Sequence, residues 1–131
     1  MPSVVVIDTH VLIQDALEPR RLSARARRAL EGADGPLAAS DISLWEVAML
    51  IAKARVRPGA DAATFIERLL EARAIHVLPI TAKIAVLSQA DDFEHGDPAD
   101  RIIAATAIVH GAQLVTADAQ LRRVPGLRVL W

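Results

Sequence analysis

The stretch Val4-Val5-Val6-Ile7-Asp8 decides the class of fold that we predict, because an apolar run of strand length ends there at an acidic residue. A strand with one face in water alternates apolar and polar residues, whereas a strand buried on both faces of a parallel sheet is apolar throughout. We therefore predict that residues 4–7 form a buried strand of a parallel sheet. Four more runs are candidate strands: residues 36–40, 75–80, 113–116 and 127–130.

Segments with helical periodicity lie between these strands: residues 41–54, 62–73, 81–90 and 98–110. The first places Ile42, Trp45, Met49 and Ala52 on one face, and the third groups Ile84, Val86 and Leu87. Alternating strands and helices indicate an α/β fold, with a central, mostly parallel sheet of about four to five strands and helices on both faces. We see no linker that divides the chain, and we treat residues 1–131 as one domain.

The overall composition excludes several classes of protein. With 131 residues, 53% of them hydrophobic, and a formal net charge of −1, the chain can bury a core and is not intrinsically disordered. It has no cysteine and so no disulfide framework, which fits a reducing compartment. No apolar run approaches the roughly 20 residues that span a bilayer, and the N-terminus has no signal-peptide pattern. We expect a cytoplasmic protein without a membrane segment.

Five acidic residues lie just after predicted strands or in the helices that follow: Asp8, Glu46, Asp97, Asp100 and Asp118. Because the carboxyl ends of parallel strands share one edge of a sheet, we expect these side chains to converge there. Acids are also favoured N-caps, so capping alone is an alternative for Asp8, Asp97 and Asp118. Glu46 lies inside a helix, where it has no capping role; it belongs either to a solvated face or to the cluster.

Carboxylates gathered in one place repel each other unless a positive charge lies among them. The nearest basic residues in sequence lie at least a helical turn away or point elsewhere, so a divalent cation is the better partner. An all-oxygen donor set, without cysteine or a pair of histidines, favours Mg²⁺ or Mn²⁺ over Zn²⁺. Sites of this kind commonly activate water for attack on phosphates, which suits the hydrolysis of phosphodiester bonds.

Two threonines lie beside these acids. Thr9 follows Asp8, and Thr116 comes two residues before Asp118. Either hydroxyl can hold a bound water or a phosphate oxygen, although a threonine at a strand end is more often simply a good strand former. We keep both as candidate supporting residues.

Four segments of the chain match a known pattern in order and spacing: Val-Val-Val-Ile-Asp-Thr-His at 4–10, Ser-Asp-Ile-Ser-Leu-Trp-Glu-Val-Ala at 40–48, Asp-Pro-Ala-Asp-Arg-Ile-Ile-Ala-Ala-Thr-Ala at 97–107, and Leu-Val-Thr-Ala-Asp at 114–118. With these segments the sequence resembles the PIN-domain family, and within it the VapC-type toxins of toxin–antitoxin pairs. By this resemblance the family's acidic quartet falls on Asp8, Glu46, Asp100 and Asp118. Asp97 matches a frequent additional acid, which we interpret as a helix cap and supporting residue.

The resemblance implies a Mg²⁺- or Mn²⁺-dependent endoribonuclease that leaves a 5′-phosphate and a 3′-hydroxyl. It also implies a homodimer, and inhibition by a cognate antitoxin that wraps an apolar groove and can place a basic side chain among the carboxylates. Two alternatives stay open. One is a phospho-accepting signalling domain, which needs a lysine after a later strand, yet Lys53 and Lys83 both lie in predicted helices. The other is a PIN-like module that binds RNA or protein without catalysis.

Other polar and aromatic residues receive plainer interpretations. Trp45 shares the apolar stripe of its helix, which predicts a core anchor rather than a base-stacking surface. The four histidines, His10, His76, His95 and His110, show no pairing typical of a general base, although His10 lies only two residues from Asp8. Residues 20–28 contain five arginines and no acid, which indicates either a solvated helix face or a contact to phosphates.

The near-zero net charge is compatible with a polyanionic substrate. If the five acids form one site, 11 acidic residues and 15 basic residues remain for the rest of the molecule. An acidic metal pocket in a mildly basic surround lets a cation and an RNA backbone bind side by side.

Overall fold

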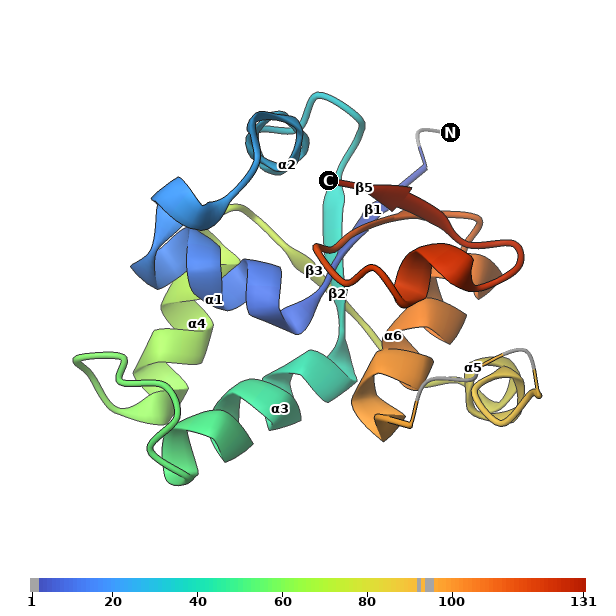
Figure 1. The fold of residues 1–131 in the computed structure, drawn as a ribbon. Helices are drawn as coiled ribbons and strands as arrows, with labels where there is room; N and C mark the ends of the chain where they lie inside the picture. The colour runs from blue at the N-terminus through green and yellow to red at the C-terminus, as the bar shows by residue number, and fades with distance from the viewer. Residues whose placement is uncertain (1–2, 92, 94–95) are drawn as a thin grey trace.

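The strands of the protein form one sheet in which all neighbours run parallel. The structure is a computed structural model that describes residues 3–91, 93 and 96–131 (Figure 1). Its strands are β1 (Val5–Ile7), β2 (Leu37–Ser40), β3 (His76–Leu78), β4 (Gln113–Val115) and β5 (Arg128–Leu130). They lie in the order β3-β2-β1-β4-β5. Each strand falls within a predicted run, so the α/β fold with a parallel sheet is confirmed.

Helices connect the strands. Four of them match predicted segments: α3 (Asp41–Ala52), α4 (Ala62–Ala72), α5 (Ala82–Leu87) and α6 (Pro98–Val109). Four further helices were not predicted from the sequence: α1 (Thr9–Leu17), α2 (Ala24–Leu30) and the short 3-10 helices η1 (Pro19–Arg21) and η2 (Leu121–Arg123). Within the described part of the chain, no helix combines the length and apolar character that crossing a bilayer requires.

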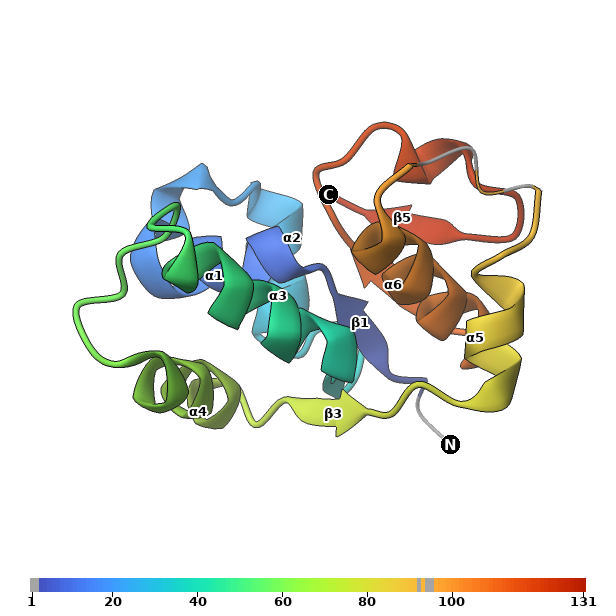
Figure 2. The same cartoon turned by 90° about the horizontal axis from the view of Figure 1, so that it is seen from below.

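The helices cover both faces of the sheet, as Figures 1 and 2 show on either side of β1. Val5 and Ile7 face the layer that contains α1, α2 and α4, where the core includes Phe65. Val6 faces the opposite layer and packs with Ile84 of α5 and with α6. The central strand is therefore buried on both sides, as an unbroken apolar run predicts.

Alanine dominates the buried face of α6. Ala104, Ala105 and Ala107 are fully buried, and the helix contacts β1, β2 and β4. Because these side chains are single methyl groups, the helix axis can lie close to the sheet. The abundance of alanine in the sequence thus has a direct use in the packing.

Helix α3 buries a different face from the predicted one. Its buried residues are Ser43, Glu46, Val47 and Leu50, whereas Trp45 is 58% exposed. The prediction that Trp45 anchors the core is therefore wrong. Val86 of α5, also assigned to an apolar stripe, is 75% exposed. In α3 the predicted face was wrong because this helix turns Ser43 and Glu46 toward its neighbours α1 and α6. In α5 only Val86 was misplaced, since Ile84 is fully buried as predicted.

Two glycines before β2 test how closely this segment packs against the N-terminal backbone at Ser3. Gly32 and Gly35 both have a positive φ, of +91° and +133°, but a Cβ at Gly35 would collide with the backbone oxygen of Ser3. We expect Gly32→Ala to lower the free energy of unfolding by about 1 kcal/mol, which is the cost of a left-handed backbone. Gly35→Ala should lower it by about 3 kcal/mol or more, because backbone atoms must move. Denaturant titration measures both, and equal losses would contradict this packing.

Candidate functional site

The acidic residues meet at the carboxyl-terminal edge of the sheet. Strand β1 leads directly into Asp8, whose backbone N–H donates to the Val115 oxygen of β4 at 3.0 Å. Ser40 ends β2, and its hydroxyl caps α3, so Glu46 lies in the second turn of that helix. Asp118 follows β4 after two residues. Because β2, β1 and β4 are parallel neighbours, their ends bring these acids together.

Thr116 links two of the acids. Asp8 is only 4% exposed, and its Oδ2 accepts a hydrogen bond from Thr116 Oγ1 at 2.7 Å. The same threonine oxygen accepts the backbone N–H of Asp118 at 3.1 Å. Burial raises the pKa of the Asp8 carboxyl, and the hydrogen bond from Thr116 partly opposes this rise. The other oxygen, Asp8 Oδ1, is buried without a hydrogen-bond partner among the described residues.

Glu46 belongs to the buried face of α3. It is 4% exposed, and its Oε1 has no hydrogen-bond partner in the described part of the chain. Burial raises the pKa of Glu46, whereas the Thr9 hydroxyl and the nearby His10 lower it. Thr9 Oγ1 also donates to Ser43 Oγ at 2.8 Å, which fixes the first turn of α1 against α3. Thr9 therefore lies in a helix, and its side chain helps to organise the site.

Helix α6 contributes two acids from its first turn. Asp97 is the N-cap, with Oδ1 accepting the Ala99 N–H at 2.9 Å, so its predicted capping role is confirmed. Asp100 is 7% exposed. Carboxylate oxygens of Glu46, Asp97 and Asp100 all lie within 4.8 Å of one another, close enough to share one cation. The charges of Asp8 and Asp97 raise the pKa of Glu46 beyond the effect of burial.

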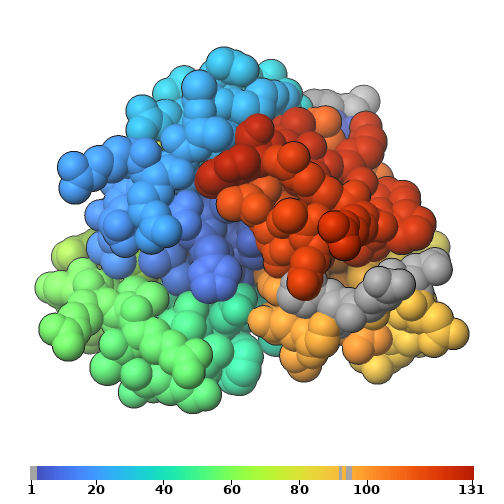
Figure 3. Space-filling view, in the orientation of Figure 1, coloured from blue at the N-terminus to red at the C-terminus, as the bar shows by residue number. Residues whose placement is uncertain are grey.

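A cavity of about 270 Å³ opens beside these acids, lined by Asp8, His10, Val11, Gln14, Asp100, Ala117 and Asp118. In Figure 3 the blue-violet N-terminal segment lies between the red C-terminal segment and the green segment of the chain. Glu46 does not line this cavity, but it interacts electrostatically with Asp8. The structure thus brings together all five predicted acids, three at the cavity wall and Glu46 and Asp97 beside Asp100.

Two residues of the cavity wall were missed as site residues by sequence reasoning. His10 and Gln14 line the cavity because α1 starts directly after Asp8, and this helix was not predicted. Their spacing of four residues is the one signal in the sequence that could have placed them on the acidic side. His76 and His110 lie on other elements, and His95 falls outside the described residues.

The arrangement fits a hard divalent cation. The donors are carboxylate oxygens, two of which are buried without a hydrogen-bond partner among the described residues, and no lysine lines the cavity there. Arg101, adjacent to Asp100, donates instead to the Ser88 oxygen at 2.9 Å. Unpaired buried carboxylates are costly, and Mg²⁺ or Mn²⁺ prefers oxygen ligands of this kind.

The arginine-rich stretch 20–28 divides into paired and exposed members. Arg25 binds Asp34 through two hydrogen bonds of 2.8 and 2.6 Å. Arg27 donates to the Pro19 oxygen at 3.1 Å. Arg20, Arg21 and Arg28 are exposed, and Arg21 lies 3.8 Å from a carboxylate of Glu18. Part of the stretch therefore stabilises the α1–α2 region, and the rest faces solvent.

Comparisons with known proteins show the family to which the chain belongs. The sequence is similar to Ribonuclease VapC22 of Mycobacterium tuberculosis (strain ATCC 25618 / H37Rv), with 41% identity over 119 residues, 90% of this chain and 89% of that protein. A toxin–antitoxin complex from Klebsiella pneumoniae contains a chain with a TM-score of 0.64 and 28% identity, over 94% of both chains. VapBC2 from Rickettsia felis, bound to promoter DNA, gives a TM-score of 0.76 at 19% identity over 96% of both chains. The PIN domain model matches residues 5–127, and this chain therefore belongs to the PIN domain family.

Proposed function

We propose that this chain is a Mg²⁺- or Mn²⁺-dependent endoribonuclease and the toxin of a toxin–antitoxin pair. One observation carries the proposal: carboxylates from four separate stretches of the chain converge, with Asp8 Oδ1 and Glu46 Oε1 buried and unpartnered among the described residues. Such a site is suited to phosphodiester hydrolysis. The 41% identical relative is named a ribonuclease, which supports RNA as the substrate.

Each acid has a role in this proposal. Asp8, Glu46, Asp100 and Asp118 would hold the cation, and Asp97 would support them from the start of α6. When bound, a divalent cation neutralises phosphate charge and lowers the pKa of water. Asp8 and Glu46 are buried, and a carboxylate removed from bulk water interacts more strongly with a nearby charge.

The two threonines position these acids. The Thr116 hydroxyl orients Asp8 and receives the backbone of Asp118, while Thr9 holds α1 against α3 near Glu46. Carboxylates whose orientation is fixed before a ligand enters need little rearrangement to bind it. We therefore assign Thr9 and Thr116 as supporting residues rather than as cation ligands.

Several exposed arginines suit contact with an RNA backbone. Arg122 and Arg123 form η2 shortly after Asp118, and both are exposed. Arg20 and Arg28 are exposed on the α2 side. The planar guanidinium binds phosphate oxygens well, and such contacts add affinity without sequence selectivity.

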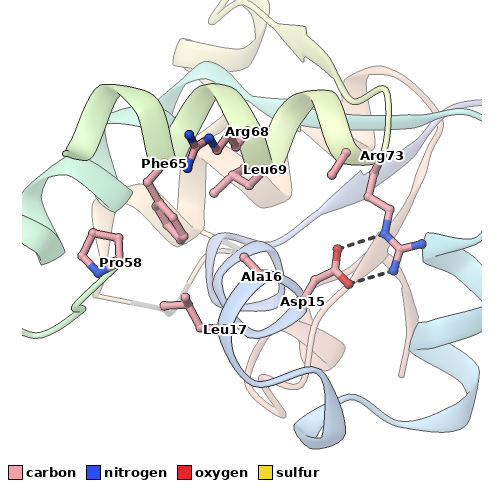
Figure 4. Close-up of a pocket in the computed structure, with 9 residues that line it drawn as sticks. Asp15, Ala16, Leu17, Pro58, Phe65, Arg68, Leu69 and Arg73 are labelled. Carbon is pink, nitrogen blue, oxygen red and sulfur yellow. Dashed lines mark hydrogen bonds and ion pairs between the residues drawn. The ribbon is translucent and has the colours of Figure 1, made fainter. Parts of the chain in front are cut away.

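A groove between α1 and α4 supports an antitoxin as the partner. It has a volume of about 510 Å³ and lies between Leu17 on α1 and Phe65 on α4, with Pro58 toward one end (Figure 4). The ion pair of Asp15 and Arg73, 2.9 Å apart, lies toward the other end. We propose that an apolar segment of the cognate antitoxin binds there. The complexes among the similar structures support a protein partner of this class.

A second apolar hollow lies on the opposite layer and suits the proposed homodimer. It is lined by α5 and α6 through Ala82, Lys83, Val86, Leu87, Ile108 and Val109. Its most exposed large hydrophobic side chain is Val86. Covering this surface with a second copy would remove an exposed valine from water, which is favourable.

The proposed function makes a first prediction of its own, which concerns catalysis. Asp8→Asn keeps the shape of the side chain but removes its charge, so we expect cleavage of RNA with Mn²⁺ to fall by at least about 100-fold. Asp91→Asn, which removes an exposed carboxylate elsewhere, should leave the rate unchanged. Full-length RNA cleavage by Asp8→Asn would contradict the assignment. A wild-type protein that binds Mn²⁺ and RNA without cutting would favour the non-catalytic module.

The second prediction concerns stability without metal. Burial raises the pKa of Asp8 above its usual 3.8, so its contribution to stability is fully present below pH 3.8 and is lost as the pH rises through the raised pKa. In EDTA at pH 7, Asp8→Asn should therefore melt about 2–5 °C above the wild type, and this gain should shrink toward pH 4. Mn²⁺ should raise the Tm of the wild type more than that of the variant. Scanning calorimetry measures both effects, and a variant that melts lower in EDTA would contradict them.

The third prediction separates the two apolar surfaces. Leu17→Asp places a charge in the α1–α4 groove and should weaken binding of an antitoxin C-terminal segment by about tenfold or more. Val86→Asp should instead shift the protein toward monomer in analytical ultracentrifugation, with antitoxin binding retained. Each variant serves as the control for the other. If Val86→Asp lost antitoxin binding and Leu17→Asp kept it, the two surfaces would be assigned wrongly.

A further inference from the structure

Helix α1 lines the acidic cavity with two polar residues that are not acids. His10 and Gln14 are four residues apart, so they lie one turn from each other on the same face of the helix. The proposed function explains the carboxylates and leaves these two side chains without a role. Their position in the cavity wall places them where a substrate would contact the protein.

Gln14 has an unsatisfied hydrogen-bonding atom. Its Oε1 is buried and has no partner among the described residues. Asp8, Asp100 and Asp118, which share the cavity, offer carboxylate oxygens, and these accept hydrogen bonds as the Gln14 oxygen does. A buried acceptor without a donor is destabilising. A ligand that brings an O–H or N–H group into the cavity would satisfy the Gln14 oxygen.

His10 lines the cavity from its solvent-exposed side, whereas the Gln14 oxygen is buried. It is exposed, it lines the same cavity, and it lies one turn before Gln14. Its flat ring is a surface on which a nucleic-acid base can stack. The pair therefore combines an acceptor inside the cavity with an aromatic ring at its accessible side.

We propose that Gln14 Oε1 accepts a hydrogen bond from a ribose 2′-hydroxyl at the cleavage site, while the His10 ring stacks on the adjoining base. The 2′-hydroxyl is a small donor, and it is the group by which RNA differs from DNA. Gln14 is then a positioning residue that selects RNA over DNA. This inference rests on the proposed function, since it requires that RNA enters this cavity.

The test measures RNA binding rather than activity. The protein is Glu46→Gln, which removes cleavage under the proposed function and changes no residue that lines this cavity. The probes are an RNA that the wild type cleaves and copies with one 2′-deoxynucleotide at or beside the cut site. Fluorescence anisotropy should show about five- to tenfold weaker binding for one deoxy copy.

The decisive comparison adds a second substitution at Gln14. In Glu46→Gln with Gln14→Met, the all-RNA probe should bind about five- to tenfold more weakly, and the deoxy copy should bind no worse than the RNA. Gln89→Met is the matched control: that exposed glutamine contacts Ser88 and does not line the cavity, so the deoxy effect should persist. Gln14→Met removes an unpaired polar atom, so its Tm should be no lower than that of its parent. Gln14→Leu repeats the comparison with a second apolar side chain.

Three outcomes would overturn the inference. An undiminished deoxy effect in both Gln14 variants contradicts a contact to the 2′-hydroxyl. A tenfold loss of Mn²⁺ affinity in Gln14→Met with Glu46 intact, measured by calorimetry, makes Gln14 a cation ligand instead. A wild type that cuts no RNA contradicts the proposed function and this inference together, whereas the first two results leave the ribonuclease proposal standing.

Discussion

The parallel pairing of β1 between β2 and β4 is the constraint on which the rest of the structure depends. Val5 pairs with Leu37 on one side and with Gln113 on the other, so the chain leaves all three strands at the same edge. Residues far apart in sequence then become neighbours; the hydrogen bond from Thr116 to Asp8 spans 108 positions. In an antiparallel sheet, the same three strand ends would alternate between opposite edges.

Bringing the acidic side chains together lowers the stability of the fold around the site. Asp8 and Glu46 are buried, each has an oxygen without a hydrogen-bond partner among the described residues, and burial raises the pKa of both. Hydrophobic layers on both faces of the sheet supply the stabilisation that lets such a cluster persist. The threonines reduce the cost by giving hydrogen bonds to the site without adding charge. The site is thus strained by repulsion and supported by the core around it.

Much of the architecture could be predicted because strand burial and helix capping are local signals. The apolar run 4–7 and the cap at Asp97 each act through neighbouring residues, and both are observed. The buried face of α3 could not be predicted, because it depends on the contacts of this helix with α1 and α6. On this face Glu46 is buried, whereas Trp45 is exposed on another side of the helix. Likewise, the convergence of the acids follows from the strand order, whereas the place of Gln14 in the cavity wall depends on α1, which the sequence pattern did not reveal. The roles of the acids remain predictions.

The alanine face of α6 ties the spacing of the acids to the volume of distant side chains. Ala104 and Ala105 hold the helix against the sheet, and Asp100 is part of the same rigid element. A bulkier side chain at either alanine would lift the helix and carry Asp100 away from Glu46, even though neither alanine is among the acidic residues. The volume of the buried side chains on α6 therefore sets the distance between Asp100 and Glu46. Small residues at these positions are needed for the dimensions of the site, as the carboxylates are needed for its chemistry.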